Sequence, residues 1–296
     1  MMVLIGVLFC PLTSWPAELS FTGMFYLDEG NNVSVMDQVG DIYRLDWQTS
    51  HGKIVGACQG DYVFAERLTE EQESGEIDAF PKTGYKERNY GRFSLGAPGG
   101  ILGVTPTGKS LIFFEWGEMA AFDIQSVVVS GPGDYSFYDF HQLPGAGWLR
   151  SISFSADQNY FFLHNSGEDG WHGRIFKTDT KEPVLNLPHE GAQWSDWIMA
   201  GAFHPTNPHV FAYILESHPS GDTDEDSVSS TLLITDFQTQ KEQRWILTTQ
   251  KPHGDIISWT PDGLHIILEE GDNLVLLNIQ TGVARILCQG KNPVCF

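Results

Sequence analysis

Residues 255–287 read DIISWTPDGLHIILEEGDNLVLLNIQTGVARIL. Four short apolar runs in this stretch are separated by turn-forming residues, the clearest of which are Pro261, Asp262 and Gly263. Proline presets the backbone for the first central position of a turn, and glycine adopts positive φ without strain. The stretch therefore predicts four antiparallel strands, at residues 256–259, 265–268, 274–279 and 283–287, joined by tight turns.

The first turn of this unit recurs along the chain with an apolar residue before it. Its relatives are Val104-Thr105-Pro106-Thr107-Gly108, Phe154-Ser155-Ala156-Asp157 and Phe203-His204-Pro205-Thr206. The third positions, residues 106, 156, 205 and 261, are 50, 49 and 56 residues apart. A period in this range indicates stacked supersecondary units such as propeller blades.

A second repeated position supports the first. Apolar strands carry an Asp or Asn at Asp46, Asp78, Asp123, Asp179, Asp236 and Asn278. Six such strands predict an all-β fold, a single β-propeller of about six (five to seven) four-stranded blades over residues 18–296. Closure of the ring removes exposed sheet edges, so residues before Thr49 are expected to pair with the blade that contains Leu274–Leu287.

The unit resembles the repeats of the WD40-like and TolB-like propeller families. In both, a strand leads through a Ser/Thr-Pro-Asp-Gly turn into a second strand, and an Asp-bearing strand ends in Thr-Gly. The similarity covers about Phe21 to Leu287 and is strongest from Ile101 onward. The Trp-Asp dipeptide is missing from the strand ends, so the resemblance implies a fold and no functional residues.

Charge narrows the class of partner. The 296 residues include 17 Lys and Arg against 38 Asp and Glu, a formal net charge of −21. Such a field repels phosphate backbones and anionic lipid head groups, which argues against nucleic-acid and membrane-surface binding. An acidic surface also keeps an aromatic-rich chain soluble.

Residues 1–17 have two interpretations. The apolar run MMVLIGVLFCPL is too short for a transmembrane helix and resembles the hydrophobic region of a signal peptide cleaved after Ala17. This interpretation predicts a secreted or periplasmic protein. The alternative is a buried strand that closes the ring in a cytoplasmic protein.

Cysteines and metal-ligand patterns give weak signals. Cys288 and Cys295 flank a segment that turns at Gly290 and Pro293, so the two thiols are expected to meet if the compartment is oxidising. Two clusters are candidate metal ligands, the first with zinc-like and the second with calcium-like donors: His164, Glu168, Asp169 and His172, and Asp222, Asp224 and Asp226. We expect no cofactor, because the first cluster fits a glycine-rich hairpin and the second lacks the glycine and glutamate of a calcium loop.

Aromatic residues among polar ones are candidates for a partner-binding surface. They are Tyr135, Phe137, Tyr138, Phe140, Trp194 and Trp197. Interfaces use such rings, and packing between blades uses them as well.

No nucleophile elbow, His-Glu-x-x-His motif or phosphate-binding loop occurs in the sequence. The favoured function is a non-catalytic scaffold that binds a protein or peptide partner at its rim or channel mouth, as a subunit of a larger assembly. The alternative is a propeller hydrolase or lactonase-like enzyme with a metal in the central channel.

Overall fold

The chain is all-β in the parts that the structure describes. The computed structural model describes residues 21–48, 53–57, 60, 62–68, 75–83, 91–94, 99–106, 110–116, 124–130, 135–139, 148–167, 170–187, 196–217, 229–247 and 256–296. Within these ranges the regular elements are 24 β-strands, and no helix is long and apolar enough to cross a membrane. Residues 1–17, with their two interpretations, lie outside the described ranges.

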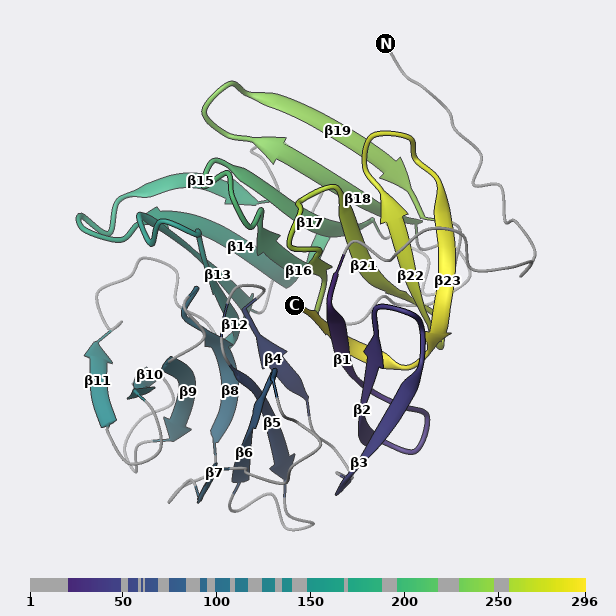
Figure 1. Cartoon of the computed structure of the whole chain (residues 1–296). Coiled ribbons are helices and arrows are strands. Elements are labelled where there is room, and N and C mark those ends of the chain that lie inside the picture. The colour runs from purple at the N-terminus through teal and green to yellow at the C-terminus, as the bar shows by residue number, and fades with distance from the viewer. Residues whose placement is uncertain are drawn as a thin grey trace.

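The strands form six four-stranded sheets arranged as blades around a central axis (Figure 1). From the axis outward, blade 1 consists of β24 (Lys291–Cys295), β1 (Gly23–Leu27), β2 (Asn32–Asp37) and β3 (Ile42–Gln48), and blade 2 of β4 (Ile54–Gly56), β5 (Tyr62–Leu68), β6 (Gly75–Pro81) and β7 (Gly91–Ser94). Blade 3 consists of β8 (Gly99–Val104), β9 (Ser110–Trp116), β10 (Ile124–Ser130) and β11 (Tyr135–Asp139), and blade 4 of β12 (Trp148–Phe154), β13 (Tyr160–Gly167), β14 (Gly170–Lys177) and β15 (Pro183–Leu187). Blade 5 consists of β16 (Asp196–Phe203), β17 (Val210–Ser217), β18 (Ser229–Asp236) and β19 (Lys241–Ile246), and blade 6 of β20 (Ser258–Trp259), β21 (His265–Glu270), β22 (Asn273–Asn278) and β23 (Ala284–Gln289).

The innermost strands β4, β8, β12, β16, β20 and β24 contact one another in ring order. All strand pairs are antiparallel within the blades, and the four strands predicted for residues 256–287 form blade 6. A single all-β propeller is therefore confirmed, with a number of sheets inside the expected range of five to seven.

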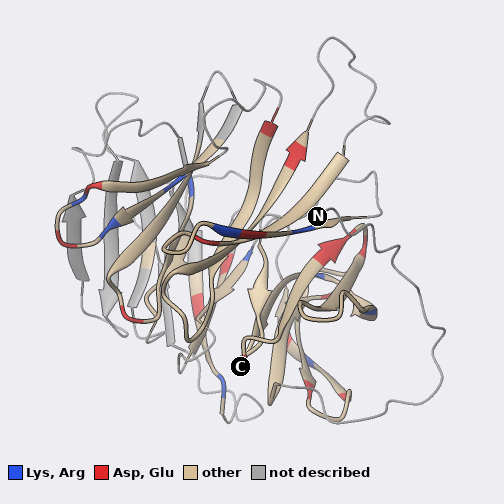
Figure 2. Cartoon of the chain, turned by 90° about the horizontal axis from the view of Figure 1, so that it is seen from above, with Lys and Arg blue, Asp and Glu red and all other residues tan. Residues whose placement is uncertain are grey.

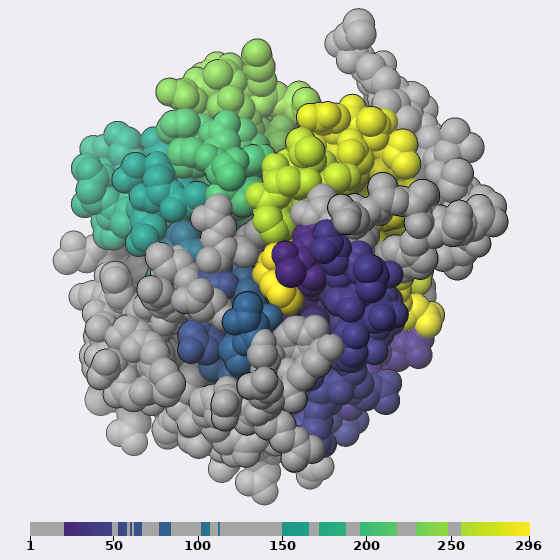
Figure 3. All heavy atoms as spheres, viewed as in Figure 1, coloured from purple at the N-terminus to yellow at the C-terminus, as the bar shows by residue number. Residues whose placement is uncertain are grey.

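The ring closes through the C-terminal strand. β24 pairs with β1, with Cys295 opposite Met24 and Val294 opposite Phe25, so the last and first strands lie side by side (Figure 3). The expectation that residues before Thr49 pair with the blade of Leu274–Leu287 was wrong in its partner, because those residues form a separate sheet.

The sequence predicts a turn at Pro293. The structure places Pro293 instead in β24, at the inner edge of its sheet, where a missing N–H costs no ladder bond. Cys288 lies in β23 and Cys295 in β24, and both are free thiols, so the disulfide expected for an oxidising compartment is not formed in this structure.

The repeated turns of blades 4 and 6 share a hydrogen bond between a hydroxyl and a carboxylate. In blade 6 the Thr260 hydroxyl lies 2.6 Å from an Asp262 carboxylate oxygen, and Gly263 has a φ of 69°. In blade 4 Ser155 and Asp157 repeat the contact at 2.7 Å. Each turn links the innermost strand of its blade to the second, so the repeat read from the sequence marks the ends of the inner strands.

The prediction that an Asp or Asn takes an equivalent place in each blade is only partly correct. Asp236 and Asn278 end the third strands of blades 5 and 6 and accept hydrogen bonds from backbone N–H groups of the turns that follow. Asp46 lies instead in the outermost strand of blade 1, and Asp78 is buried in the middle of β6. Asp37, which ends β2 and accepts turn N–H groups at 3.0 and 2.9 Å, takes the corresponding place in blade 1. Of the two remaining predicted positions, Asp179 follows β14, and Asp123 lies outside the described ranges.

Apolar and aromatic side chains pack between neighbouring blades. The rings of Phe162, in blade 4, and Phe211, in blade 5, have centroids 4.6 Å apart. A Cβ atom at Gly201 would lie 2.4 Å from the Phe211 ring, so this glycine gives the ring its space. Acidic residues are spread over several blades rather than gathered in one place (Figure 2).

Candidate functional site

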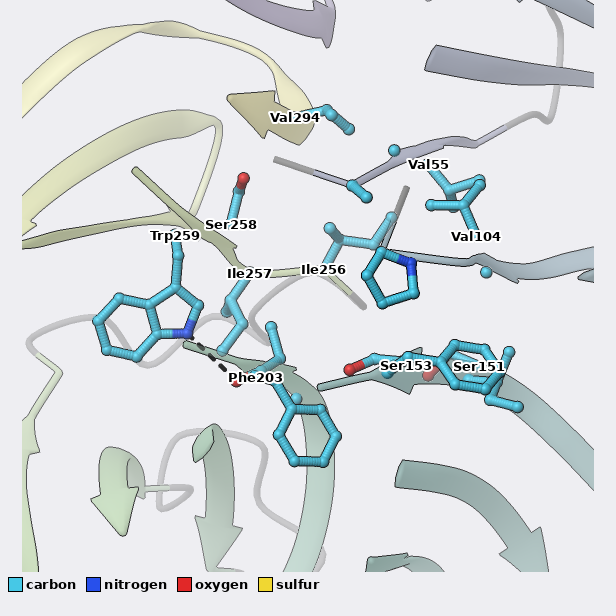
Figure 4. A pocket seen from close by; sticks show the side chains of 18 of the residues that line it. Val55, Val104, Ser151, Ser153, Phe203, Ile256, Ile257, Ser258, Trp259 and Val294 are labelled. Atoms are coloured by element: carbon cyan, nitrogen blue, oxygen red, sulfur yellow. Dashed lines mark hydrogen bonds between the residues drawn. The ribbon is translucent and has the colours of Figure 1, made fainter. Parts of the chain in front are cut away.

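A cavity of about 170 Å³ lies on the propeller axis. Every blade contributes a side chain to its wall (Figure 4). One from each inner strand or its flank is Val55, Val104, Ser153, Phe203, Ile257 and Val294. Most of the wall is apolar, as is usual for ligand pockets.

Glycines allow the inner strands to come close around this cavity. A Cβ atom at Gly103 would lie 2.0 Å from the Ile152 carbonyl oxygen, and one at Gly56 would lie 2.5 Å from Val294 Cγ1. No rotamer relieves a clash with backbone, so a side chain at Gly103 would force blades 3 and 4 apart. The narrow axis thus depends on small residues at these positions.

The charged residues of the cavity wall are basic. Lys53 precedes β4, and its Nζ donates to the carbonyl oxygen of Arg150, 3.3 Å away in β12. Arg150 lies where the pairing register of β12 with β13 shifts, a β-bulge that changes the direction of a side chain. No carboxylate side chain lines the cavity among the described residues, although the chain as a whole carries a formal charge of −21.

His164 lies in the wall beside these cations. Its side chain is 1% exposed, and its Nδ1 lies 3.5 Å from the Ser151 hydroxyl. Burial lowers its pKa to about 4; a hydrogen bond with the Ile198 backbone opposes the shift, and the charges of Arg150 and Lys53 add to it. The imidazole is therefore neutral at pH 7, and it experiences a positive potential at this end of the cavity.

A second histidine, His204, has a structural role. Its Nδ1 accepts hydrogen bonds from the backbone N–H groups of Thr206 and Asn207 at 3.2 and 3.1 Å. Its Nε2 lies 3.2 Å from the Gly263 carbonyl oxygen, and its ring packs edge-on against Trp259. Nδ1 thus holds the turn of blade 5 together, and Nε2 joins that turn to the turn of blade 6.

The structure separates the histidines of the first metal candidate. His164 pairs with Gly173, and His172 pairs with Asn165, so the two imidazoles point to opposite faces of one sheet. Glu168 and Asp169 lie outside the described ranges, between Gly167 and Gly170, which pair with each other as the predicted hairpin requires. No group of three or more His, Cys, Asp or Glu in the described residues is arranged to hold a metal ion. Asp222, Asp224 and Asp226 lie outside the described part of the chain.

Four of the six aromatic candidates lie in described strands. Tyr135, Phe137 and Tyr138 lie in β11, the outermost strand of blade 3. Trp197 is half-buried in β16, the innermost strand of blade 5. It packs against the hydrophobic cluster between blades 5 and 6. Its position favours the packing interpretation. Phe140 and Trp194 lie outside the described ranges.

Lys53 and Arg150, which line the cavity, were not among the site residues predicted from the sequence. One signal was available: basic residues are rare in this chain, and Arg150 lies inside the strand that precedes a repeated turn. Bringing the two cations to one place required the ring, because they belong to blades 2 and 4.

The sequence matches no protein-family model and no curated protein. Among solved structures it is similar to TolB from Acinetobacter baumannii, with a TM-score of 0.64 and 13% identity over 93% of this chain. It spans 66% of that TolB chain. The resemblance to TolB-like propellers is confirmed at the level of the fold.

Two further structures share the architecture. A chain from a nidogen/laminin complex matches with a TM-score of 0.59 and 9% identity over 92% of this chain and 97% of its own length. A proposed 6-phosphogluconolactonase from Bacteroides fragilis matches with a TM-score of 0.53 and 11% identity over 94% of this chain and 98% of its own length. Identities this low show a common fold and carry no activity across.

Proposed function

We propose that this protein is a non-catalytic propeller that binds a peptide segment of a protein partner in its axial cavity. The observation that carries the proposal is the chemistry of the cavity wall. It combines apolar side chains with cations and hydroxyl groups, and no carboxylate lines it among the described residues. Such a wall can orient a bound segment through a few polar contacts and bury its apolar part.

The wall suits binding better than hydrolysis. Glycoside hydrolysis uses a pair of carboxyl groups, and a hard cation such as calcium is held mainly by oxygen ligands. The described wall offers neither set, and His204 is engaged in the turn between blades. A lactonase-like enzyme with a metal in the channel remains the rival, and purified protein that hydrolyses a lactone or ester would favour it.

Capture of the partner tests the proposal. Ser153 lies on the cavity wall (Figure 4), and Ser153→Phe should fill part of the space. We expect the wild-type protein to capture one partner from its native source and Ser153→Phe to lose it. Thr180→Phe is the matched control, because it adds the same ring at an exposed position of the same blade.

Both variants need melting temperatures close to the wild type for the comparison to count. Cross-links between the partner and residues at the cavity mouth, located by mass spectrometry, would support the axial site. Equal capture by Ser153→Phe, or cross-links confined to outer strands, would contradict it.

A secreted or periplasmic location, with cleavage after Ala17, is part of the proposal. It rests on the apolar run at residues 1–12. N-terminal sequencing of the mature protein from its source tests it: a chain that still begins at Met1 would favour the cytoplasmic alternative.

A further inference from the structure

We propose that the axial cavity takes an apolar side chain of the partner peptide, of the size of Leu or Phe, at the end formed by the repeated turns. This inference rests on the proposed function, since it names the part of the peptide that the cavity takes. Three features of the cavity carry it: the turn residues that line it, the hydrogen bonds that polar side chains of its wall already make, and its volume.

The repeated turns give the cavity an apolar end. Their third residues in blades 3, 4 and 5 are Pro106, Ala156 and Pro205, and all three line the wall. Each follows the innermost strand of its blade, so the three come to the axis from neighbouring blades. None of these side chains carries a polar atom, and proline has no backbone N–H to offer. This end of the cavity is therefore suited to contact with hydrocarbon groups.

The polar side chains that adjoin these turns are already hydrogen-bonded within the protein. Trp259 Nε1, the single donor of the indole, donates to the Ala202 carbonyl oxygen at 3.2 Å (Figure 4). Both ring nitrogens of His204 are engaged in the turns of blades 5 and 6. The Ser258 hydroxyl oxygen accepts from the Cys295 N–H at 3.1 Å. A polar group that entered here would give up its hydrogen bonds to water and find these partners engaged, whereas an apolar group gives up none.

Buried apolar side chains continue this surface along the axis. Blades 1, 2, 3, 5 and 6 contribute Val294, Val55, Val104, Phe203 and Ile257 to the wall, and each of them is buried. Burial of methyl and methylene groups against such a wall is favourable in proportion to the area removed from water. The wall thus favours an aliphatic or aromatic side chain over a polar one of the same size.

Volume sets the size of the group. A cavity of about 150 Å³ holds a molecule the size of benzene, and this one measures about 170 Å³. A single Leu or Phe side chain therefore fits, and a folded domain must stay outside. The close approach of the inner strands at Gly56 and Gly103 keeps the cavity at this size.

Four short peptides test the inference by calorimetric titration of the whole chain. One is acetyl-Ala-Leu-Ala-amide, and the others have Phe, Asn or Glu in place of Leu. We expect the Leu and Phe peptides to bind at least about tenfold more tightly than the Asn peptide, because Asn is similar in size to Leu but polar. The binding enthalpy of the Leu peptide should become more negative as the temperature rises, the heat-capacity signature of apolar burial.

Salt separates apolar from ionic recognition. The affinity of the Leu peptide should be the same at low and at high sodium chloride, because no charge pair forms on binding. Tighter binding of the Asn or Glu peptide than of the Leu peptide would assign recognition to polar contacts and overturn the inference. A Leu-peptide affinity that falls steeply with salt would do the same.

A hydroxyl group placed in the wall locates the site. Val104→Thr keeps the shape of the side chain and adds a polar atom at a buried position of β8, so it should weaken the Leu peptide by about fivefold. Val39→Thr is the matched control, because it makes the same change at a residue that is 69% exposed between β2 and β3, and it should leave the affinity unchanged. If Val104→Thr does not fold, Ser153→Phe is the second variant, and it should abolish binding of the Leu peptide by filling the cavity. Wild-type affinity in the folded cavity variant would overturn the inference.

Equal affinities for the Leu and Asn peptides, or no binding of any of the four, would overturn the inference without the need for a variant. If the native partner is nevertheless captured by the wild type and lost in Ser153→Phe, the proposed function stands and only the apolar anchor is wrong. If the Leu peptide binds as expected and no partner is captured, the cavity binds apolar groups and the proposed function fails.

Discussion

His204 in blade 5 donates from Nε2 to the carbonyl oxygen of Gly263 in blade 6, across 3.2 Å. The assignment of the proton follows from Nδ1, which accepts two backbone N–H groups and so must be unprotonated. The bond joins the repeated turns of adjacent blades. It also leaves no space above Gly263, where a Cβ atom would lie 2.2 Å from Nε2.

Gly263→Ala should destabilise the protein through two effects. Alanine is strained at a φ of 69°, which costs about 1 kcal/mol, and its methyl group would displace His204. In a His204→Ala background only the backbone strain should remain. Urea denaturation of the wild type, both single variants and the double variant separates the two effects, and strictly additive changes would show that the contact carries no energy.

Stability should fall as the pH drops from about 6.5 to about 4. The pKa of His164 is lowered to about 4 by burial, so the unfolded state binds a proton more readily than the folded state in this window. The stabilisation is complete above pH 6.5 and is lost on acidification, with a size of about 3 kcal/mol. His204 and His265, whose pKa values burial also lowers, add to the same slope.

His164→Gln should flatten this pH dependence, and urea midpoints between pH 7 and 4 measure it. The carboxyl groups whose pKa is lowered, Asp28, Asp157 and Asp236, titrate at lower pH and provide an internal reference. A His164→Gln protein with the wild-type slope would show that another group is responsible.

Asn292 should be a critical residue of ring closure. Its backbone N–H donates to Glu269 at 2.7 Å, its Oδ1 accepts from the Ile54 N–H at 3.3 Å, and its φ is 53°. Asn292→Ala should cost roughly 2 kcal/mol from lost hydrogen bonds and backbone strain. Asn292→Gly should cost about 1 kcal/mol less, because glycine accepts the positive φ. The opposite ranking of the two variants in urea would contradict this account.

Calcium should not stabilise the protein. We expect the loop with Asp222, Asp224 and Asp226 to be solvated and to bind no calcium. The melting temperature of the protein should therefore be the same in the presence of calcium and of a chelator. A rise in melting temperature with calcium that disappears when residues 222–226 are deleted would assign a calcium site to this loop.

Local sequence was sufficient to predict the strands wherever a turn is formed by its own residues. Thr260, Asp262 and Gly263 form their turn largely among themselves, so the motif predicted blade 6 and, by repetition, the propeller. The Asp position was less reliable. Asp46 precedes a Trp in a strand just as Asp236 precedes a Phe, but only the hydrogen bonds of the following turn distinguish a strand end from a strand interior.

The sequence by itself determined the repeat, the all-β class and the acidic character of the chain, because each depends on neighbouring residues or on composition. The tertiary structure decided which strand closes the ring and which side chains meet on the axis. Val294 becomes an inner-strand residue only when β1, more than 250 residues earlier in the chain, offers it an open edge. Lys53 and Arg150, 97 residues apart, become neighbours only because six inner strands converge on one narrow axis.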